Sequence, residues 1–254
     1  MKDMKTIELE GHGKIVIDRR TEIYVPHLDE VLAFTLLMTG PNHFKKVMGA
    51  IDKDGGLRPT TAQTLSLVDL VLQNPDEEHC RYILSRFMRG YLLTSTENLF
   101  GKTDVIIYDY DDVDGTMPRD RAGLVKRHKD GDKAVRIVPY GFRTGRQSTD
   151  EFLKNPWVIA QIKDKEMLEI VRKVAEKVSE IRGAKTPSEK ESGVWALNPT
   201  KNDVETYSVL GSGWGGGRGL SLIGSFCYND SAYKEGYASR VQNVSPETVV
   251  KPSS

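Results

Sequence analysis

Residues 210–241 read LGSGWGGGRGLSLIGSFCYNDSAYKEGYASRV, and they decide what the rest of the chain has to support. Seven glycines lie between Gly211 and Gly224. Each glycine in a helix interior costs about 1 kcal/mol relative to alanine, so this stretch disfavours a helix. The alternation of Leu220, Leu222 and Gly224 instead predicts a short strand, and residues 236–241 predict another.

Three interpretations of this glycine-rich stretch compete. A phosphate cradle would use backbone N–H groups, but neither GxxxxGK[ST] nor GxGxxG before a helix is present, and a strand follows the glycines. A binding surface would use Tyr, Ser, Gly and Asn with an occasional Trp, which is the composition of adaptable binding loops. The third interpretation is a flexible hairpin without a function. Composition favours the binding surface over the cradle.

The pattern SxWxxxRxLxLxG followed by GYAxRV resembles the C-terminal variable region of C-type-lectin-fold proteins that are diversified by retroelements. In that family, adenines of a template are replaced at random, mostly within asparagine codons. Such codons can become Gly, Ser, Tyr, Cys, Phe, Asp, Ala or Asn, but never Trp, Lys, Glu or Gln. The stretch consists almost wholly of reachable residues. The longer chain is similar to archaeal or archaeal-virus members.

The resemblance implies a division between a fixed scaffold and a variable, exposed ligand-binding surface. The scaffold residues would be Trp214, Arg218, Leu220, Leu222, Tyr237 and Arg240, with the two arginines paired to carboxylates or carbonyls. The variable residues would be Gly211, Gly213, Gly215, Gly216, Ser221, Ser225, Phe226, Cys227, Tyr228, Asn229, Ser231 and Tyr233.

The resemblance also implies the fold class, which is α+β and C-type-lectin-like with helical elaborations. Residues 57–60, LRPT, precede a predicted helix and resemble the RxPT segment of the formylglycine-generating-type branch of that fold. We expect a single domain over residues 1–241, with 210–241 as its variable ligand-binding region and 242–254 as a polar tail. No internal repeat or linker divides the chain.

Composition bounds the class of protein. The 254 residues are 38% hydrophobic and 28% charged, which is ordinary for a soluble globular protein. A formal net charge of +0 gives no basic excess, so we expect no nucleic-acid partner. Two cysteines, Cys80 and Cys227, provide no disulfide framework or CxxC metal spacing. No signal peptide and no membrane span are predicted, so a place on a virion or cell surface would need another route.

Local patterns predict the remaining elements in order. Strands are expected at residues 6–9, 14–17, 104–108 and 134–138, and helices at 27–39, 42–51, 60–73, 77–89 and 167–181. Thr60-x-x-Gln63 and Ser148-x-x-Glu151 read as capping boxes. The charged residues 119–132 are expected to form a surface loop.

The sequence offers little for metal binding or catalysis. The acidic residues 109–114 fail the EF-hand template, because Tyr110 and Arg121 would occupy ligand positions 1 and 12. A solvated acidic turn is the preferred interpretation, and an irregular metal site the alternative. The five histidines show no ligand spacing, and GxSxG and SxxK are absent. The formylglycine-generating relatives use cysteines, whereas Cys227 stands at a predicted variable position. We expect no cofactor, no metal and no enzyme activity.

The sequence therefore predicts a non-enzymatic ligand-binding protein of the receptor or tropism type. Its partner would be a protein or glycan on a cell or virus surface. The alternatives are an enzyme of the formylglycine-generating-like branch, a phosphate-handling enzyme, and a structural virion or surface component.

Overall fold

The computed structural model describes residues 4–110, 117–186, 189–213, 218–227 and 236–244, with the backbone alone for 225–227. Two sheets form its framework. The five-stranded sheet has the order β1 (Lys5–Glu8), β2 (Lys14–Ile17), β3 (Glu22–His27), β4 (Glu30–Thr35) and β14 (Val241–Val244). The nine-stranded sheet has the order β5 (Thr39–Asn42), β13 (Gly236–Ala238), β6 (Tyr91–Phe100), β11 (Val204–Ser212), β12 (Leu220–Cys227), β10 (Ser192–Trp195) and β9 (Gly145–Gln147), with β7 (Asp104–Asp109) beside β6 and β8 (Val135–Pro139) beside β7.

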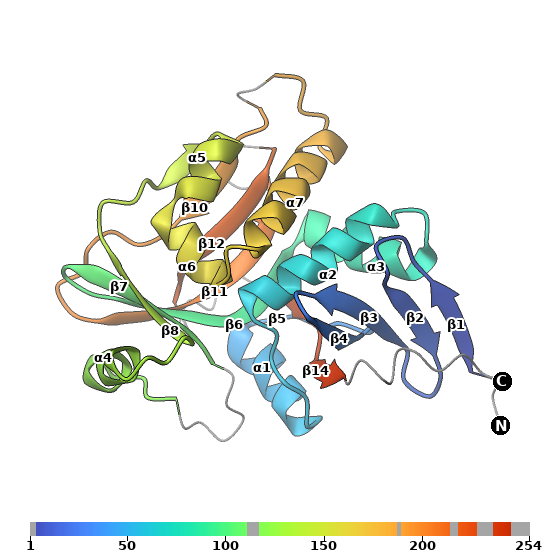
Figure 1. The fold of residues 1–254 in the computed structure, drawn as a ribbon, viewed down its shortest axis with the longest axis horizontal. Coiled ribbons are helices and arrows are strands. Elements are labelled where there is room, and N and C mark those ends of the chain that lie inside the picture. The colour runs from blue at the N-terminus through green and yellow to red at the C-terminus, as the bar shows by residue number, and fades with distance from the viewer. Residues whose placement is uncertain (1–3, 111–116, 187–188, 214–217, 228–235, 245–254) are drawn as a thin grey trace.

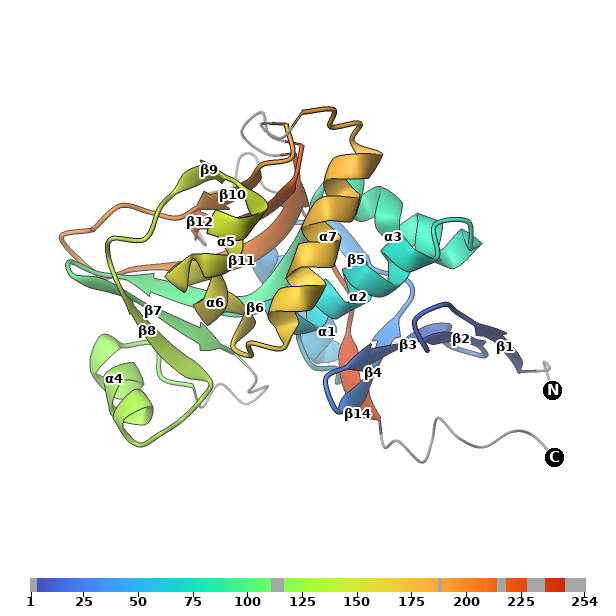
Figure 2. The ribbon, with the colours of Figure 1, turned by 45° about the horizontal axis from the view of Figure 1, so that its top comes forward.

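Helices cover both faces of the nine-stranded sheet (Figures 1 and 2). They are α1 (Phe44–Lys53), α2 (Thr61–Gln73), α3 (Glu78–Arg89), α4 (Arg121–Lys129), α5 (Thr149–Lys154), α6 (Pro156–Ile162) and α7 (Met167–Ile181). We call the face that packs against α2, α3, α6 and α7 the inner face, and the face that packs against α1 the outer face. The five-stranded sheet lies beside this body, and in Figure 1 its strands β1 to β4 are blue and β14 is red.

Several predicted helices form for the local reasons that their sequences show. The Thr60 side chain accepts from the backbone N–H of Gln63, whose own side chain accepts from the N–H of Thr60, so the predicted capping box opens α2. Ser148 and Glu151 form the second box at α5. Helix α7 is amphipathic, so its apolar stripe, with Val171, Val174 and Val178, packs against the core and its charged face is left toward solvent.

Residues 27–39 are not a helix, and this prediction was wrong. His27 ends β3, Leu28 and Asp29 form a two-residue turn, and β4 begins at Glu30. Leu28, expected on the apolar face of a helix, is 42% exposed and has a φ of 51°. The extended conformation is favoured over a helix because β4 pairs with β3 on one side and with β14 on the other.

Two further boundaries differ from the sequence prediction. Residues 119–132 contain the helix α4, which Asp120 caps by accepting from the N–H of Gly123. Its last turn carries several basic side chains, which favour the negative end of the helix dipole. The polar tail begins later than predicted, because residues 242–244 pair with β4 inside the five-stranded sheet.

Candidate ligand-binding face

The C-terminal stretch supplies a central strand of the nine-stranded sheet. β12 pairs antiparallel with β11 and parallel with β10, so hydrogen bonds hold it on both sides. Leu220 and Leu222 point to the inner face and are 1% and 2% exposed. Ile223 points to the outer face, where it packs with Val209 under α1. The predicted alternation is thus present, and the two predicted scaffold leucines lie in the core.

Gly224 lets the strand pass close to a tryptophan of the inner face. A Cβ at this position would lie 2.5 Å from a ring carbon of Trp157, which is fully buried, and 3.1 Å from the amide nitrogen of Asn98. A buried ring cannot move aside as an exposed side chain does. Glycine is therefore required here by space rather than by a turn.

Replacing Gly224 with alanine should lower the free energy of unfolding by about 1–3 kcal/mol, the usual cost of overpacking a core. The matched control is Gly49→Ala, because Gly49 lies in α1 with no atom within 4 Å of an added Cβ. That change should raise stability by about 0.5–1 kcal/mol through helix propensity. Urea unfolding of both variants measures the two signs, and equal effects would contradict the close-approach explanation.

A closed ring of three buried hydrogen bonds supports the middle of the strands from the inner face. Asn98 donates to the hydroxyl of Ser208 at 2.9 Å, Ser208 donates to Gln161 at 2.7 Å, and the amide of Gln161 donates back to Asn98 at 2.5 Å. All three side chains are at most 1% exposed. The ring ties β6, β11 and α6 together, and no local pattern in the sequence indicates it.

One end of the stretch is anchored around the turn between β11 and β12. The N–H of Gly213 donates to the carbonyl of Gly219 at 3.0 Å, which closes the described ends of that turn. Gly213 has a φ of +73°, and the guanidinium of Arg182 would lie 3.0 Å from a Cβ there. Arg182 in turn donates to the hydroxyl of Ser212 at 2.6 Å. The turn is therefore fastened to the end of α7.

The predicted scaffold arginines both have backbone and carboxylate partners. Arg218 donates to the carbonyl of Gly183 and lies 3.5 Å from the carboxylate of Glu189, whose pKa is lowered by hydrogen bonds from the backbone N–H of Lys185. Arg240 donates to the carbonyl of Asp54 at 3.2 Å and lies 3.5 Å from a carboxylate oxygen of Glu22. Tyr237 is half-buried, and the guanidinium of Arg86 lies 5.2 Å from the centre of its ring.

Two residues predicted to be exposed ligand contacts are buried. Gly211 and Ser221 are register partners on neighbouring central strands, and Ser221 is 2% exposed. The ring of Tyr91 lies 3.2 Å from a Cβ placed on Gly211, and Trp195 folds back over Gly193, the partner of Ser221 on its other side. Large side chains from adjacent strands therefore close over the small ones. This corrects the predicted exposure of both positions.

The other predicted site residues divide between described and undescribed parts of the chain. Gly213 is partly exposed at the turn. Ser225, Phe226 and Cys227 belong to β12, where Phe226 pairs with Tyr207 and Cys227 with Thr206. The remaining positions lie outside the described residues, and they are Trp214, Gly215, Gly216, Tyr228, Asn229, Ser231 and Tyr233.

Sequence reasoning missed two aromatic residues at the edge of this surface. Tyr91 begins β6 and Trp195 ends β10, and both are half-buried on the outer face. The indole nitrogen of Trp195 is itself buried, so these two residues would offer ring surface rather than a hydrogen-bond donor. Aromatic side chains are enriched at binding surfaces. A signal existed in the sequence, since each aromatic residue lies at the end of a β-favouring run.

The described residues offer no clear catalytic constellation. Within the described ranges, no cluster of three or more His, Cys, Asp or Glu could hold a metal ion. Asp109 is the first residue of the acidic turn and is described. Its carboxylate accepts hydrogen bonds from Arg136, at 2.7 Å, and from the hydroxyl of Thr96. Burial, with the nearby Glu77 carboxylate, raises the pKa of the Cys80 thiol to about 12, which disfavours the reactive thiolate.

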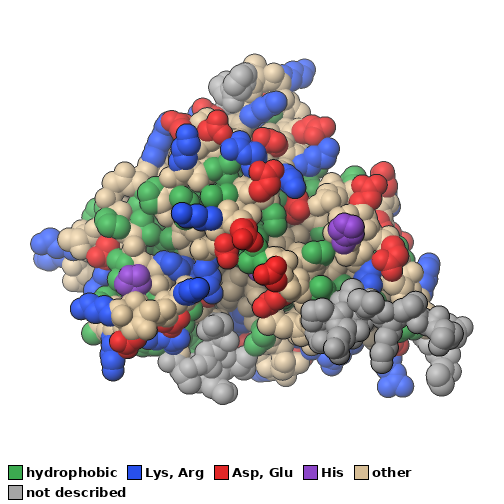
Figure 3. Space-filling view, viewed as in Figure 1, with side chains coloured by type: hydrophobic (Ala, Val, Ile, Leu, Met, Phe, Trp, Pro, Cys, Tyr) green, Lys and Arg blue, Asp and Glu red, His purple; other side chains and the backbone are tan. Residues whose placement is uncertain are grey.

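Both signs of charge are found on the surface of the protein. Basic and acidic side chains are interspersed over the face shown in Figure 3. The formal net charge of the whole chain is +0. In the part of the chain that the structure describes, no helix combines the length and the apolar character needed to cross a membrane.

Comparisons with known proteins identify the fold. A scan against protein-family models found no match, and neither did a search of curated proteins. Among solved structures, the chain is similar to one from work on the accommodation of massive sequence variation in Nanoarchaeota by the C-type lectin fold. The two share 13% sequence identity at a TM-score of 0.50, over 90% of this chain and 100% of that one. The chain therefore has a mixed α+β architecture of the C-type lectin type.

Proposed function

We propose that this chain is a non-enzymatic ligand-binding protein whose C-terminal surface is diversified by a retroelement. The single observation that carries the proposal is that the described parts of the stretch 210–241 are fixed to the rest of the protein. Its apolar residues Leu220 and Leu222 are core residues, and Arg218 and Arg240 are clamped by backbone carbonyls. Segments rich in reachable residues therefore begin and end at fixed points. Substitution at exposed positions usually changes stability by less than about 0.5 kcal/mol.

The proposed ligand-binding positions are the predicted variable set without Gly211 and Ser221, which are buried. They are Gly213, Gly215, Gly216, Ser225, Phe226, Cys227, Tyr228, Asn229, Ser231 and Tyr233. Phe226, Tyr228 and Tyr233 would supply the aromatic contacts, with Tyr91 and Trp195 at the margin. The partner would be a protein or glycan on a cell or virus surface. Display on a virion or cell surface of an archaeal system fits this role.

Sequencing this gene from sibling isolates tests the proposal. Under the proposal, substitutions concentrate at the proposed positions, stay within the reachable residue types and spare Leu220 and Leu222. The surrounding genes should include a reverse transcriptase and a near-copy of the last coding segment. Substitutions spread evenly along the chain, with neither gene feature present, would reject diversification.

The second candidate function is an enzyme of the formylglycine-generating-like branch, favoured by the RPT segment that opens α2 at residues 58–60. That chemistry would require Cys227, because Cys80 is buried with a raised pKa. A Cys227→Ser variant should keep the unfolding midpoint of the parent under our proposal. Loss of a turnover activity in that variant alone would support the enzyme. A purely structural virion component would show no saturable ligand binding at all.

A further inference from the structure

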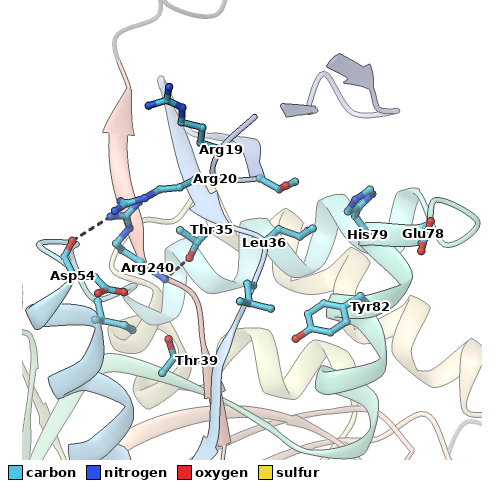
Figure 4. Close-up of a pocket in the computed structure, with 13 residues that line it drawn as sticks. Arg19, Arg20, Thr35, Leu36, Thr39, Asp54, Glu78, His79, Tyr82 and Arg240 are labelled. Atoms are coloured by element: carbon cyan, nitrogen blue, oxygen red, sulfur yellow. Dashed lines mark hydrogen bonds between the residues drawn. The ribbon is translucent and has the colours of Figure 1, made fainter. Parts of the chain in front are cut away.

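A cavity lies between the five-stranded sheet and the body of the protein (Figure 4). Its volume is about 570 Å³, which is within the usual range for sites that bind small molecules. Five segments line it, namely the turn between β2 and β3, the link between β4 and β5, the end of α1, the start of α3, and Arg240 between β13 and β14. Junctions between packed units are common places for ligand sites.

Arg240 is a fixed cation in the wall of this cavity. Its backbone N–H donates to the hydroxyl of Thr35 at 3.1 Å, and its guanidinium donates to the carbonyl of Asp54. A Cβ on Gly56 would lie 1.7 Å from the Arg240 side chain, so Gly56 provides the space for its stem. The side chain is 10% exposed. Its position is therefore set before any ligand arrives.

Arg19 and Arg20 lie on the exposed turn beside Arg240. Neither makes an ion pair among the residues that the structure describes. Figure 4 shows the Arg20 side chain extending toward the end of the cavity that Arg240 occupies. Unpaired guanidinium groups that gather at one end of a cavity favour an anion there, since they present planar sets of donors.

The carboxylates around the cavity are distributed unevenly. Glu78 and His79 lie at the end opposite the arginines, and the ring of His79 is 2.7 Å from Glu77. At the arginine end, the charge of Arg240 is balanced by Glu22. The two further positive charges of Arg19 and Arg20 are then balanced only in part, by the single negative charge of Asp54. That end therefore keeps an excess of positive charge although the whole cavity is nearly balanced.

The rest of the cavity wall is apolar. Leu36 and Ile51 line it, and Leu37 stands at its rim with 80% of its surface exposed. The ring of Tyr82 also lines it, and Figure 4 shows its hydroxyl pointing from α3 into the cavity. That hydroxyl has no hydrogen-bond partner among the described residues. An apolar wall with a few convergent polar groups is the usual form of a small-molecule site.

We propose that this cavity is a second ligand site, which binds a small organic anion with one carboxylate or phosphate head and an apolar body. The head would lie between Arg20 and Arg240, and the body against Leu36 and Tyr82. A soluble metabolite and an anionic lipid both present this chemistry. None of the described residues that line the cavity is a proposed variable position, so its ligand would not change with those positions under the proposed function.

Calorimetric titration of the full chain with phenyl phosphate, benzoate and inorganic phosphate tests the proposal. Phenyl phosphate or benzoate should bind saturably and more tightly than inorganic phosphate, because the ring adds apolar contact. Arg20→Gln should weaken binding by about tenfold or more, the effect of losing a charge-assisted hydrogen bond. The matched control is Arg89→Gln, since Arg89 is equally exposed at the far end of α3 and should bind within about twofold of the parent.

A vesicle arm separates the two sources of the anion. Co-sedimentation with phosphatidylglycerol vesicles, but not with phosphatidylcholine vesicles, that is reduced by both Arg20→Gln and Leu37→Ser would identify a lipid headgroup. Binding of the free anions that Leu37→Ser leaves unchanged would identify a soluble ligand. Absence of saturable binding in both arms would overturn the proposal. Binding that Arg20→Gln and Arg89→Gln reduce equally, with both variants shown to be folded by thermal unfolding, would overturn it as well.

Discussion

Replacing Leu222 with alanine should lower the free energy of unfolding by about 2–5 kcal/mol, the range for leucines deleted from well-packed cores. Leu222 is 2% exposed and packs on the inner face with the helices that cover it. Its neighbours belong to a sheet that is hydrogen-bonded on both sides of β12, so the backbone cannot collapse into the space. Urea unfolding monitored by tryptophan fluorescence measures the loss.

The matched control for Leu222→Ala is Leu37→Ala. The chemical change is identical, but Leu37 is 80% exposed, so stability should stay within about 0.5 kcal/mol of the parent. A result in which both variants lose the same amount would mean that β12 does not anchor the C-terminal stretch. The proposed division between scaffold and variable surface would then lose its physical basis.

Replacing Asn98 with alanine should destabilise the protein by about 2–4 kcal/mol, because it removes two buried hydrogen bonds. The amide N–H of Gln161 would lose its acceptor, and the hydroxyl of Ser208 would lose its donor while it still donates to Gln161. Thermal and denaturant unfolding measure the effect. Asn202→Ala is the control, since Asn202 is exposed, and it should change stability by less than about 0.5 kcal/mol.

A double-variant cycle shows whether the ring acts as a unit. The double variant Asn98→Ala/Ser208→Ala should lose much less stability than the sum of the losses in the two single variants, because either change alone already opens the ring. Additive losses would indicate three separate hydrogen bonds. The cooperative result would explain how β6, β11 and α6 stay fixed under the proposed exchange of surface residues.

The sequence predicted elements whose signals are local. The stripe of α7 and the two capping boxes need no partner from elsewhere in the chain, and each is present. Residues 27–39 failed because the spacing of Leu28, Leu32 and Leu36 suits a helix as well as a strand. The deciding partner, β14, lies about two hundred residues away in the chain, so no local window contains it.

The sequence predicted which residues of the C-terminal stretch belong to the core, but not which of the small residues are covered by neighbouring strands. Alternation correctly placed Leu220 and Leu222 in the core. It could not reveal that Tyr91 lies over Gly211, because the two residues become neighbours through strand pairing. The same limit hid Trp195 and the hydrogen-bonded ring beneath the strands. Residue type at a predicted variable position therefore does not establish exposure, which depends on the neighbouring strands.

The most direct measurement compares two displayed libraries by protease resistance after equal numbers of substitutions. The first library exchanges Tyr228, Asn229, Ser231 and Tyr233 among the reachable residues, and the second exchanges Asn98, Ser208, Leu220 and Leu222 in the same way. If recognition is carried by a replaceable surface on a rigid body, most members of the first library should remain folded and most of the second should not. Equal survival, or greater loss in the first library, would contradict this account.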